Sequence, residues 1–222
     1  MNNEIITIIN EQVYSQSYVI EENTQFFYRV HINSDVIAKD IELSFHIERN
    51  ATLRLEILIV HVSVSVTIMC TMNGESSNAI IHGAYILNKC NNVTIKTVQN
   101  HKIAHATSNV VIKGVLHDNA QALYSGMIRV EKNAYFTVAL QENKNIILND
   151  NARALSIPQL EVLNNDVQCF HGSAVGKFDQ DQIFYCIARG IDIKNAERLL
   201  LQGFFAGLFE NVEMNKLLEK FV

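Results

Sequence analysis

Residues 167–176, VQCFHGSAVG, contain the two side chains of this chain that are best suited to metal chemistry. Cys169 and His171 are two residues apart, so on a β-strand both would point to one side, with Gln168 and Phe170 on the other. A thiolate and a neutral imidazole are good ligands for iron or zinc, and a neighbouring histidine can lower the pKa of a thiol. Two ligands do not complete a four-coordinate site, so a partner chain or a second copy would have to supply the rest.

The same pair also fits a purely structural interpretation. Cys169 would then face the protein interior, and His171 would satisfy a buried hydrogen bond. The other cysteines lie far apart without the spacing of a metal site, so we expect free thiols that serve for packing. Three further histidines are expected to be solvated or hydrogen-bonded in the core: His82, His101 and His105.

Alternation of apolar and polar residues dominates the chain before this segment. Such a period of two predicts β-strands with one buried face. It is clearest in DIELSFHI (40–47), VSVSVTIM (62–69), VTIKTV (93–98), SNVVIKGVL (108–116) and GMIRVEK (126–132).

An Asn-Ala pair recurs between these strands. Asparagine accepts the left-handed backbone conformation at a corner, and a small alanine after it can turn inward. The last three pairs are separated by 14 and 18 residues, which we interpret as about one coil of a parallel β-helix. A sandwich built from hairpins is the competing architecture, but it needs two-residue turns, and Asn73-Gly74 is the one Asn-Gly or Asp-Gly dipeptide. The pairs begin at Asn50, Asn119, Asn133 and Asn151.

The period changes to that of helices after Gly176. Residues 178–190 have Asp179 as an N-cap and Gly190 as a stop signal, with Ile183, Phe184 and Ile187 at helical spacing. A second helix is predicted over 194–212 and continues or restarts in 213–222. Its apolar stripe consists of Ala196, Leu199, Leu200, Phe204 and Leu208.

These patterns divide the chain into a β-helix core domain, residues 1–176, and a helical segment, residues 177–222. The helical segment is expected to form an end cap on the last coil. Its apolar stripe is wider than a cap requires, so it is also a candidate docking surface for a partner.

Composition excludes several classes of function. The 222 residues are 48% hydrophobic and 18% charged, which is typical of an ordered soluble protein. The net charge of −5 argues against nucleic-acid binding. The longest apolar stretch, residues 55–70, is too short and too interrupted to span a membrane, and no secretion signal precedes it, so we expect the cytoplasm. Phosphate-binding glycine loops and hydrolase motifs are missing, so ATP hydrolysis would need another protein.

Residues 100–212 resemble the SufB/SufD family, the scaffold components of the SUF machinery that assembles iron–sulfur clusters. The resemblance implies a right-handed parallel β-helix followed by helices, in a short form without the family's N-terminal helical region. His171-Gly172-Ser173 and Asn143 make this chain closer to SufD than to SufB. The matching motifs are His105 with TS at 107, VIKG at 111, GxIRV at 126, QxN at 141, PxLE at 158, CxHG at 169, FYCIARG at 184 and AxxLLxxGF at 196.

The resemblance also implies a function and a set of site residues. His171, with Cys169 and Gly172, would lie at the interface with a SufB-like paralogue or a second copy, where a transient iron–sulfur cluster forms. The chain alone would hold no stable cofactor. A SufC-type ABC ATPase would dock on the C-terminal helices, for which the candidate residues are Arg189, Gly190, Phe204, Phe205 and Phe209.

Two other functions stay open at this point. One is a structural, self-associating β-solenoid or homodimer without a role in cluster assembly. The other is a polysaccharide-active β-helix enzyme, which is disfavoured because such enzymes cluster carboxylates on one coil face. Here the strand carboxylates are isolated from one another: Glu42, Glu56, Glu131 and Glu161.

Overall fold

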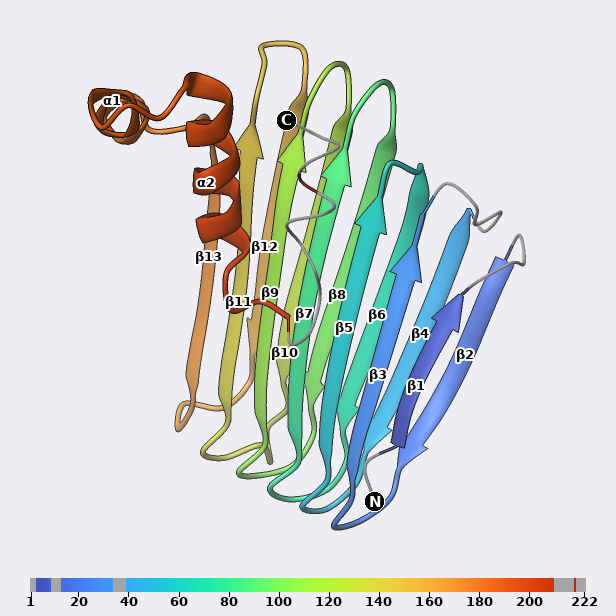
Figure 1. The fold of residues 1–222 in the computed structure, drawn as a ribbon. Helices are drawn as coiled ribbons and strands as arrows, with labels where there is room; N and C mark the ends of the chain where they lie inside the picture. The colour runs from blue at the N-terminus through green and yellow to red at the C-terminus, as the bar shows by residue number, and fades with distance from the viewer. Residues whose placement is uncertain (1–2, 9–12, 34–38, 210–217, 219–222) are drawn as a thin grey trace.

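The computed structural model of the chain describes residues 3–8, 13–33, 39–209 and 218, and these form two facing parallel sheets (Figure 1). Sheet A has the order β1 (Asn3–Ile8), β3 (Gln25–Ile32), β5 (Thr52–Val60), β7 (Asn78–Leu87), β9 (Thr107–Leu116), β11 (Val138–Ile147) and β13 (Gln168–Gly176). Sheet B has the order β12 (Arg153–Val162), β10 (Gln121–Val130), β8 (Asn92–His101), β6 (Val64–Met72), β4 (Asp40–Ile47) and β2 (Val13–Ile20).

The chain passes alternately between the two sheets, and each strand pairs in parallel with the strand one coil earlier. A coil is shorter near the N-terminus, where Asn3 is in register with Phe26, than near the C-terminus, where Gln121 is in register with Arg153. The predicted parallel β-helix is confirmed. The hairpin sandwich is excluded for the described strands, because every pairing among them is parallel.

The corners follow the prediction in part. All four alanines of the Asn-Ala pairs are fully buried, as predicted. Only Asn50 among the four asparagines takes a positive φ, and at other corners Asp118, His105 and Phe136 do so instead. The predicted coil length is wrong, because each coil contains two strands and two corners. The spacing between successive Asn-Ala pairs therefore corresponds to half a coil.

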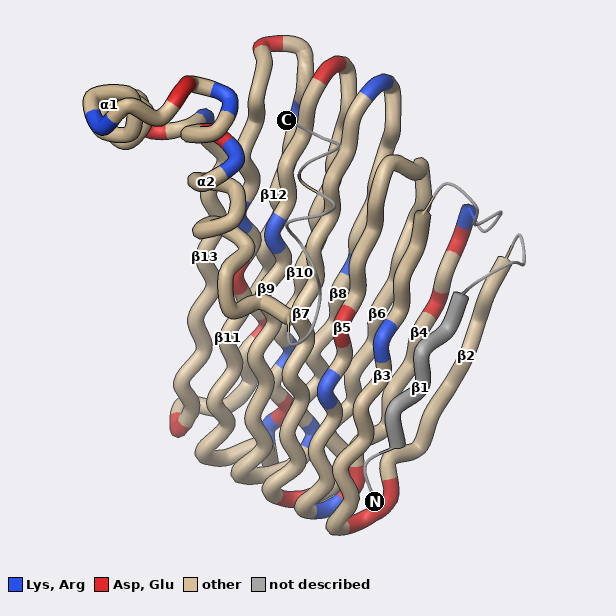
Figure 2. The backbone as a smooth tube through the Cα atoms, viewed as in Figure 1, with Lys and Arg blue, Asp and Glu red and all other residues tan. Residues whose placement is uncertain are grey.

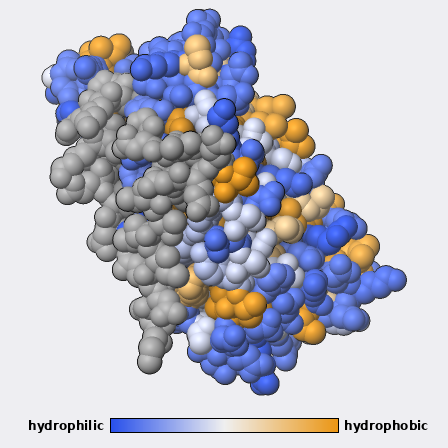
Figure 3. Space-filling model, turned by 90° about the vertical axis from the view of Figure 1, so that its right-hand side faces the viewer, coloured by the Kyte–Doolittle hydropathy of each residue, from blue (hydrophilic) through white to orange (hydrophobic). Residues whose placement is uncertain are grey.

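Apolar and aromatic side chains fill the interior of the N-terminal coils. Tyr28, Phe45 and Leu55 are fully buried, and the ring of Tyr18 stacks on Phe45 with centroids 5.5 Å apart. Burying apolar surface at about 25 cal/mol per Å² is the main stabilising contribution of such a core. On the face of the molecule shown in Figure 3, the hydrophobic patches are separated by hydrophilic atoms.

Polar side chains line the interior of the C-terminal coils. They face inward and are buried, although they come from strands of the same β-helix: Thr97, Gln99, His101, Ser108, Gln141, Asn143 and Asn145. A Cβ atom at Gly126 would clash with the side chain of Gln141, and one at Gly114 would clash with Tyr85. Gly126 therefore provides space for a large side chain from the facing sheet, and Gly114 for one from the neighbouring strand β7.

Two helices follow the last strand, α1 (Gln180–Ala188) and α2 (Ile193–Phe205). The side chain of Asp179 accepts a hydrogen bond from the Asp181 backbone N–H, so the predicted N-cap is confirmed, and Gly190 has a positive φ after α1. The predicted end of α2 at 212 is wrong, because the chain leaves the helix after Phe205. Most of the predicted continuation, 213–222, lies outside the described residues.

The predicted end cap is also wrong. The buried residues Leu201, Phe205 and Leu208 pack on the outer face of sheet A, against residues of β5, β7 and β9. Figure 1 shows α2 in front of sheet A and α1 projecting beyond the strands. Neither helix covers the inward-facing residues of the last coil, since Leu160 and Val175 stay exposed.

The charged residues are distributed over the corners and along the strands, with positive and negative charges interspersed (Figure 2). Buried charge occurs on the outer face of sheet A, where Glu56 is bonded by Arg29 at 2.6 Å and by Arg54 at 3.1 Å. Of the helices in the described ranges, none is long and apolar enough to cross a lipid bilayer.

Candidate functional site

The last coil is open, because no described strand pairs with the far edges of β12 and β13. The inward-facing residues of these two strands continue rows that are buried one coil earlier. Leu160 follows the buried Ile128 in register, yet it is 44% exposed. The interior of the β-helix is therefore accessible from this end.

Cys169 and His171 belong to the inward-facing row of β13. They are in register with Ala139 and Gln141 of β11, both of which are buried. The prediction that the pair points to one side is confirmed. Cys169 packs against Ile128 and Ala139, as the structural interpretation expected. His171, by contrast, is exposed, so the predicted buried hydrogen bond of its imidazole is wrong.

Burial determines the direction in which the pKa of the Cys169 thiol is shifted. Loss of solvation raises the pKa of its thiol, and the lowering by a neighbouring histidine that the sequence suggested is not observed. The thiol is thus held protonated until a metal or another positive charge displaces the proton. Gly172 has nothing within 4 Å of the position of a Cβ atom, which leaves open space beside His171.

The described residues do not form a complete metal site. The described part of the sequence contains no group of three or more His, Cys, Asp and Glu residues that could hold a metal ion. Cys169 and His171 would supply only two ligands, both on one open row. The remaining ligands would have to come from outside the described residues.

A chain of hydrogen bonds runs through the interior below this pair. The Gln141 side chain, next to His171 in register, accepts a bond from Gln99 at 3.4 Å. Ser108 donates to Gln99 at 2.5 Å, which requires His101 Nε2–H to donate to the Ser108 hydroxyl at 2.8 Å. His101 Nδ1 is then a buried acceptor that receives no hydrogen bond from the described residues. Burial lowers the pKa of His101 to about 4.

The two free strand edges differ in their hydrogen-bonding capacity. In β12, Arg153 N–H donates to Ala120, so odd-numbered residues bond to β10 and even-numbered residues face the free edge. Pro158 is even-numbered and has no N–H, which interrupts the free edge of β12 at its centre.

The free edge of β13 is uninterrupted. Gln168 N–H donates to Thr137, so even-numbered residues of β13 bond to β11. The backbone groups of Cys169, His171 and Ser173 therefore face outward. An extended strand can pair with this edge directly beside the two candidate ligands.

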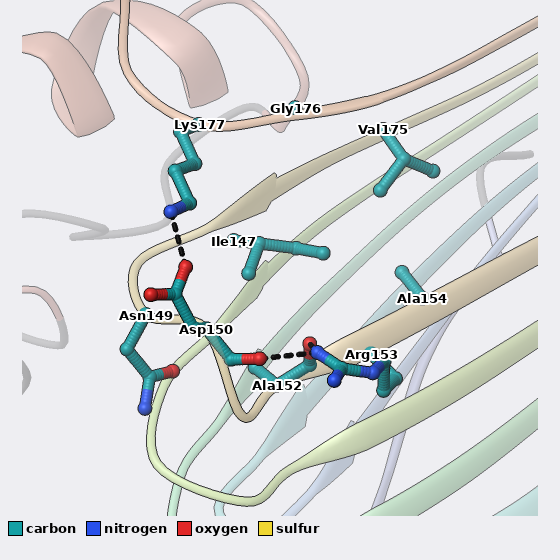
Figure 4. Close-up of a pocket in the computed structure, with 9 residues that line it drawn as sticks. All are labelled: Ile147, Asn149, Asp150, Ala152, Arg153, Ala154, Val175, Gly176 and Lys177. Atoms are coloured by element: carbon teal, nitrogen blue, oxygen red, sulfur yellow. Dashed lines mark hydrogen bonds and ion pairs between the residues drawn. The ribbon is translucent and has the colours of Figure 1, made fainter.

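A hollow of about 220 Å³ lies at one corner of the open coil. Its apolar part consists of the inward-facing residues Ile147, Ala154 and Val175, and an ion pair between Lys177 and Asp150 lies at its rim (Figure 4). The ion pair lowers the pKa of Asp150. The hollow has the size and polarity to receive a side chain from a second protein.

The five residues predicted for ATPase docking occupy two different environments. Arg189 is exposed, its backbone N–H caps the end of α1, and its guanidinium lies over the Tyr185 ring at 5.2 Å. Gly190 ends the helix. Phe204 and Phe209 are half-buried and Phe205 is only 2% exposed, so these rings face sheet A and not the solvent.

Sequence reasoning missed the exposed apolar side of α1. Phe184 is 71% exposed, and Tyr185 and Ile187 are exposed beside it. The sequence places Ile183, Phe184 and Ile187 at helical spacing, but the buried side of α1 consists of Ile183 and Cys186. The signal was the excess of apolar residues around the helix, which a narrow contact with α2 cannot bury.

Comparison with known proteins identifies the same family as the sequence motifs. The family described as SUF system FeS cluster assembly, SufBD core domain, matches residues 15–204. The chain is 32% identical over 139 residues to the iron-sulfur cluster assembly protein SufD of Escherichia coli, covering 63% of this chain and 33% of that protein. It is 29% identical over 182 residues to an iron-sulfur cluster assembly SufBD family protein of Mycobacterium leprae, covering 78% and 45%.

A third relative is the iron-sulfur cluster assembly protein SufD of Bacillus subtilis, which is 33% identical over 111 residues, 50% of this chain and 25% of that protein. The chain thus spans less than half the length of each of these relatives. The resemblance stated from the motifs is confirmed, including its SufD-like character.

Proposed function

This chain belongs to the SufBD family of SUF-system iron–sulfur cluster assembly proteins, and we propose that it acts there as a non-enzymatic scaffold. The observation that carries the proposal is the open last coil, which presents Cys169 and His171 beside a strand edge with free backbone groups. A structural metal site is usually closed by four protein ligands. Two ligands at an open edge suit a cluster that is built transiently and passed on.

The partner on this edge is a second β-helix, either a SufB-like paralogue or another copy of this chain. Its strand pairs with β13 through the outward-facing backbone groups of Cys169, His171 and Ser173. Pairing also covers the exposed inward row and places a side chain in the corner hollow. The partner supplies the missing cluster ligands, and Gly172 gives it room to approach.

A SufC-type ABC ATPase docks on α1. The exposed side chains of Phe184, Tyr185 and Ile187 form the apolar centre of this surface, and Arg189 lies at its edge. Interface cores are enriched in aromatic residues and arginine, which fits this set. The three phenylalanines of residues 204–209 serve instead to hold the helices on sheet A.

The test is co-expression with an ATPase and a SufB-like scaffold from one genome, purified without oxygen, with complex mass and iron content measured. His171→Ala is expected to lower the iron content while leaving the complex mass unchanged. The matched control is His117→Ala, because His117 is a partly exposed histidine at the corner after β9, where it pairs with Asp118. Equal iron content in both variants would contradict the role of His171.

The strand pairing has its own test. Ser173→Pro removes one N–H from the free edge of β13 without breaking a bond to β11, and it is expected to abolish pairing. Leu160→Pro does the same on β12, whose edge Pro158 already interrupts, and it is expected to leave pairing intact. Pairing that is lost in the second variant and kept in the first would refute the assignment to β13.

ATPase docking is tested by Phe184→Glu, which is expected to remove the ATPase from the complex. Leu199→Glu is the control, since Leu199 is an exposed apolar residue on α2. A stable homodimer of the wild-type chain without either partner and without iron would favour the alternative, a structural solenoid with no role in cluster assembly.

A further inference from the structure

The C-terminal end of α2 is attached to sheet A by two side chains that bond to its backbone. Lys113 Nζ on β9 donates to the Phe204 carbonyl at 2.6 Å, and His82 Nδ1–H on β7 donates to the Leu208 carbonyl at 2.7 Å. Carbonyls at a helix C-terminus lack partners within the helix and carry partial negative charge, so a cation there is favourable.

An apolar contact surrounds these two bonds. Phe205 and Leu208 are buried in one cluster with Leu58, Ala84, Ile86 and Val115, and Lys113 also lies 5.3 Å from the centroid of the Phe204 ring. Ala84 lies beside Lys113 in register. Its small side chain leaves space over β7 for the ring of Phe205. We use the term α2 anchor for Lys113, His82 and this apolar contact together.

The turn after α2 brings the second carbonyl into place. The helix ends at Phe205, and Gly207 has a φ of +73°, a conformation that side chains with a Cβ rarely adopt. The chain reverses there, and Leu208 returns to the sheet. The two anchored carbonyls thus lie on either side of a glycine turn.

The two helices form one unit beyond the anchor. Ile183 and Cys186 of α1 pack on Ala196 of α2. In Figure 1, α1 projects past the strands. The orientation of α1 therefore depends on how α2 is fixed at its far end, together with the short link from β13 in which Phe178 packs against both clusters.

We infer that the α2 anchor is a positioning device: Lys113 and His82 fix the angle between the α1–α2 pair and the β-helix. Without the two bonds, the helices stay folded against each other but pivot about the glycine turn. This inference rests on the proposed function in one respect, namely that the positioned surface of α1 binds the ATPase. The anchor would then transmit movement of the ATPase to sheet A, which contains β13.

The angle is measured with spin labels at the exposed Cys90 and at Gln182→Cys on α1, in a Cys169→Ser background. The wild-type anchor is expected to give a narrow distance distribution. Lys113→Met with His82→Phe is expected to broaden it at least twofold, and to make amide exchange in residues 193–208 about tenfold faster. Lys113→Arg keeps a cationic donor, so this variant is expected to keep the narrow distance distribution of the wild type.

Lys144→Met is the matched control, because Lys144 lies beside Lys113 in register but pairs with Glu142 at 2.9 Å. The single substitutions are measured too, so a double variant that fails to fold still leaves a test. An unchanged distance distribution and exchange rate in the Lys113 and His82 variants would overturn the inference. A wild-type chain that binds no ATPase would overturn the proposed docking but would not change this result.

Discussion

The two ends of the β-helix are built from the same kind of coil, but the side chains in their interiors differ in polarity. Near the N-terminus the interior holds Tyr28, Phe45 and Leu55, whereas near the C-terminus it holds His101, Gln141 and other amides. Apolar packing stabilises a coil directly, while a buried polar group needs a partner to avoid a penalty. The difference indicates that apolar packing stabilises the N-terminal coils, whereas the interior of the C-terminal coils depends on its hydrogen bonds.

The largest expected difference between the two ends is in the stability lost when an inward-facing leucine is truncated. Leu55 and Leu160 both face inward, but Leu55 is 0% exposed and Leu160 is 44% exposed. Leu55→Ala is expected to lower the free energy of unfolding by about 3 kcal/mol, and Leu160→Ala by less than about 1 kcal/mol. Urea denaturation of the unpaired chain measures both. Equal losses would mean that the last coil is closed.

Acid is expected to destabilise the C-terminal coils. The unfolded chain binds a proton at His101 near pH 6.5, whereas the folded chain does so only near pH 4, so the free energy of unfolding falls as the pH drops between these values. The contribution is about 3 kcal/mol. His101→Gln should remove this part of the pH dependence in thermal denaturation. His105→Gln serves as the control substitution, because His105 is exposed at the corner before β9.

Removal of one hydroxyl group should cost more in the polar interior than in the aromatic one. Tyr85 is buried and donates to Asn145, whose amide donates in turn to Asn143. Tyr85→Phe leaves a buried acceptor unpaired, with an expected loss of about 1 to 2 kcal/mol. Tyr28→Phe should cost less, since the hydroxyls near it belong to Tyr14 and Tyr18, which are only partly buried. A larger loss in the Tyr28 variant would reverse the comparison.

The smallest effect concerns thiol reactivity and leaves stability unchanged. Cys90 is exposed at a corner, whereas Cys169 is half-buried and its pKa is raised by burial. A maleimide should therefore modify Cys90 several-fold faster than Cys169. When a partner pairs with β13, the modification of Cys169 should slow further while that of Cys90 does not. Mass spectrometry of the labelled peptides distinguishes the two sites.

Much of the fold could be predicted from the sequence, because its signals are local. Period-two alternation identified β4 at its observed bounds, and Asp179 and Gly190 marked the ends of α1. The coil length was misjudged because the Asn-Ala pairs occur at both corners of a coil. A local pattern does not say how many strands separate two equivalent corners.

The site was less predictable, since it depends on contacts between distant segments. The type and spacing of Cys169 and His171 suggested a ligand pair, but their accessibility depends on the openness of the last coil. Phe205 looked available for docking because helical periodicity does not identify which neighbour buries an apolar side. Predicting that the free edges of β12 and β13 differ requires knowing which residues of β12 bond to β10. The sequence of a single segment does not contain that information.

The variation in coil length has a practical consequence for protein engineering. Strand register is unbroken across both the short coil that joins Asn3 to Phe26 and the long one that joins Gln121 to Arg153. The corners therefore absorb the extra residues while the ladders stay aligned. Corners such as 88–91, where no residue is buried, are thus natural insertion points. A fluorescent peptide tag or an affinity epitope placed there should extend outward from the solenoid, giving the scaffold a reporter that leaves its interior and its open end untouched.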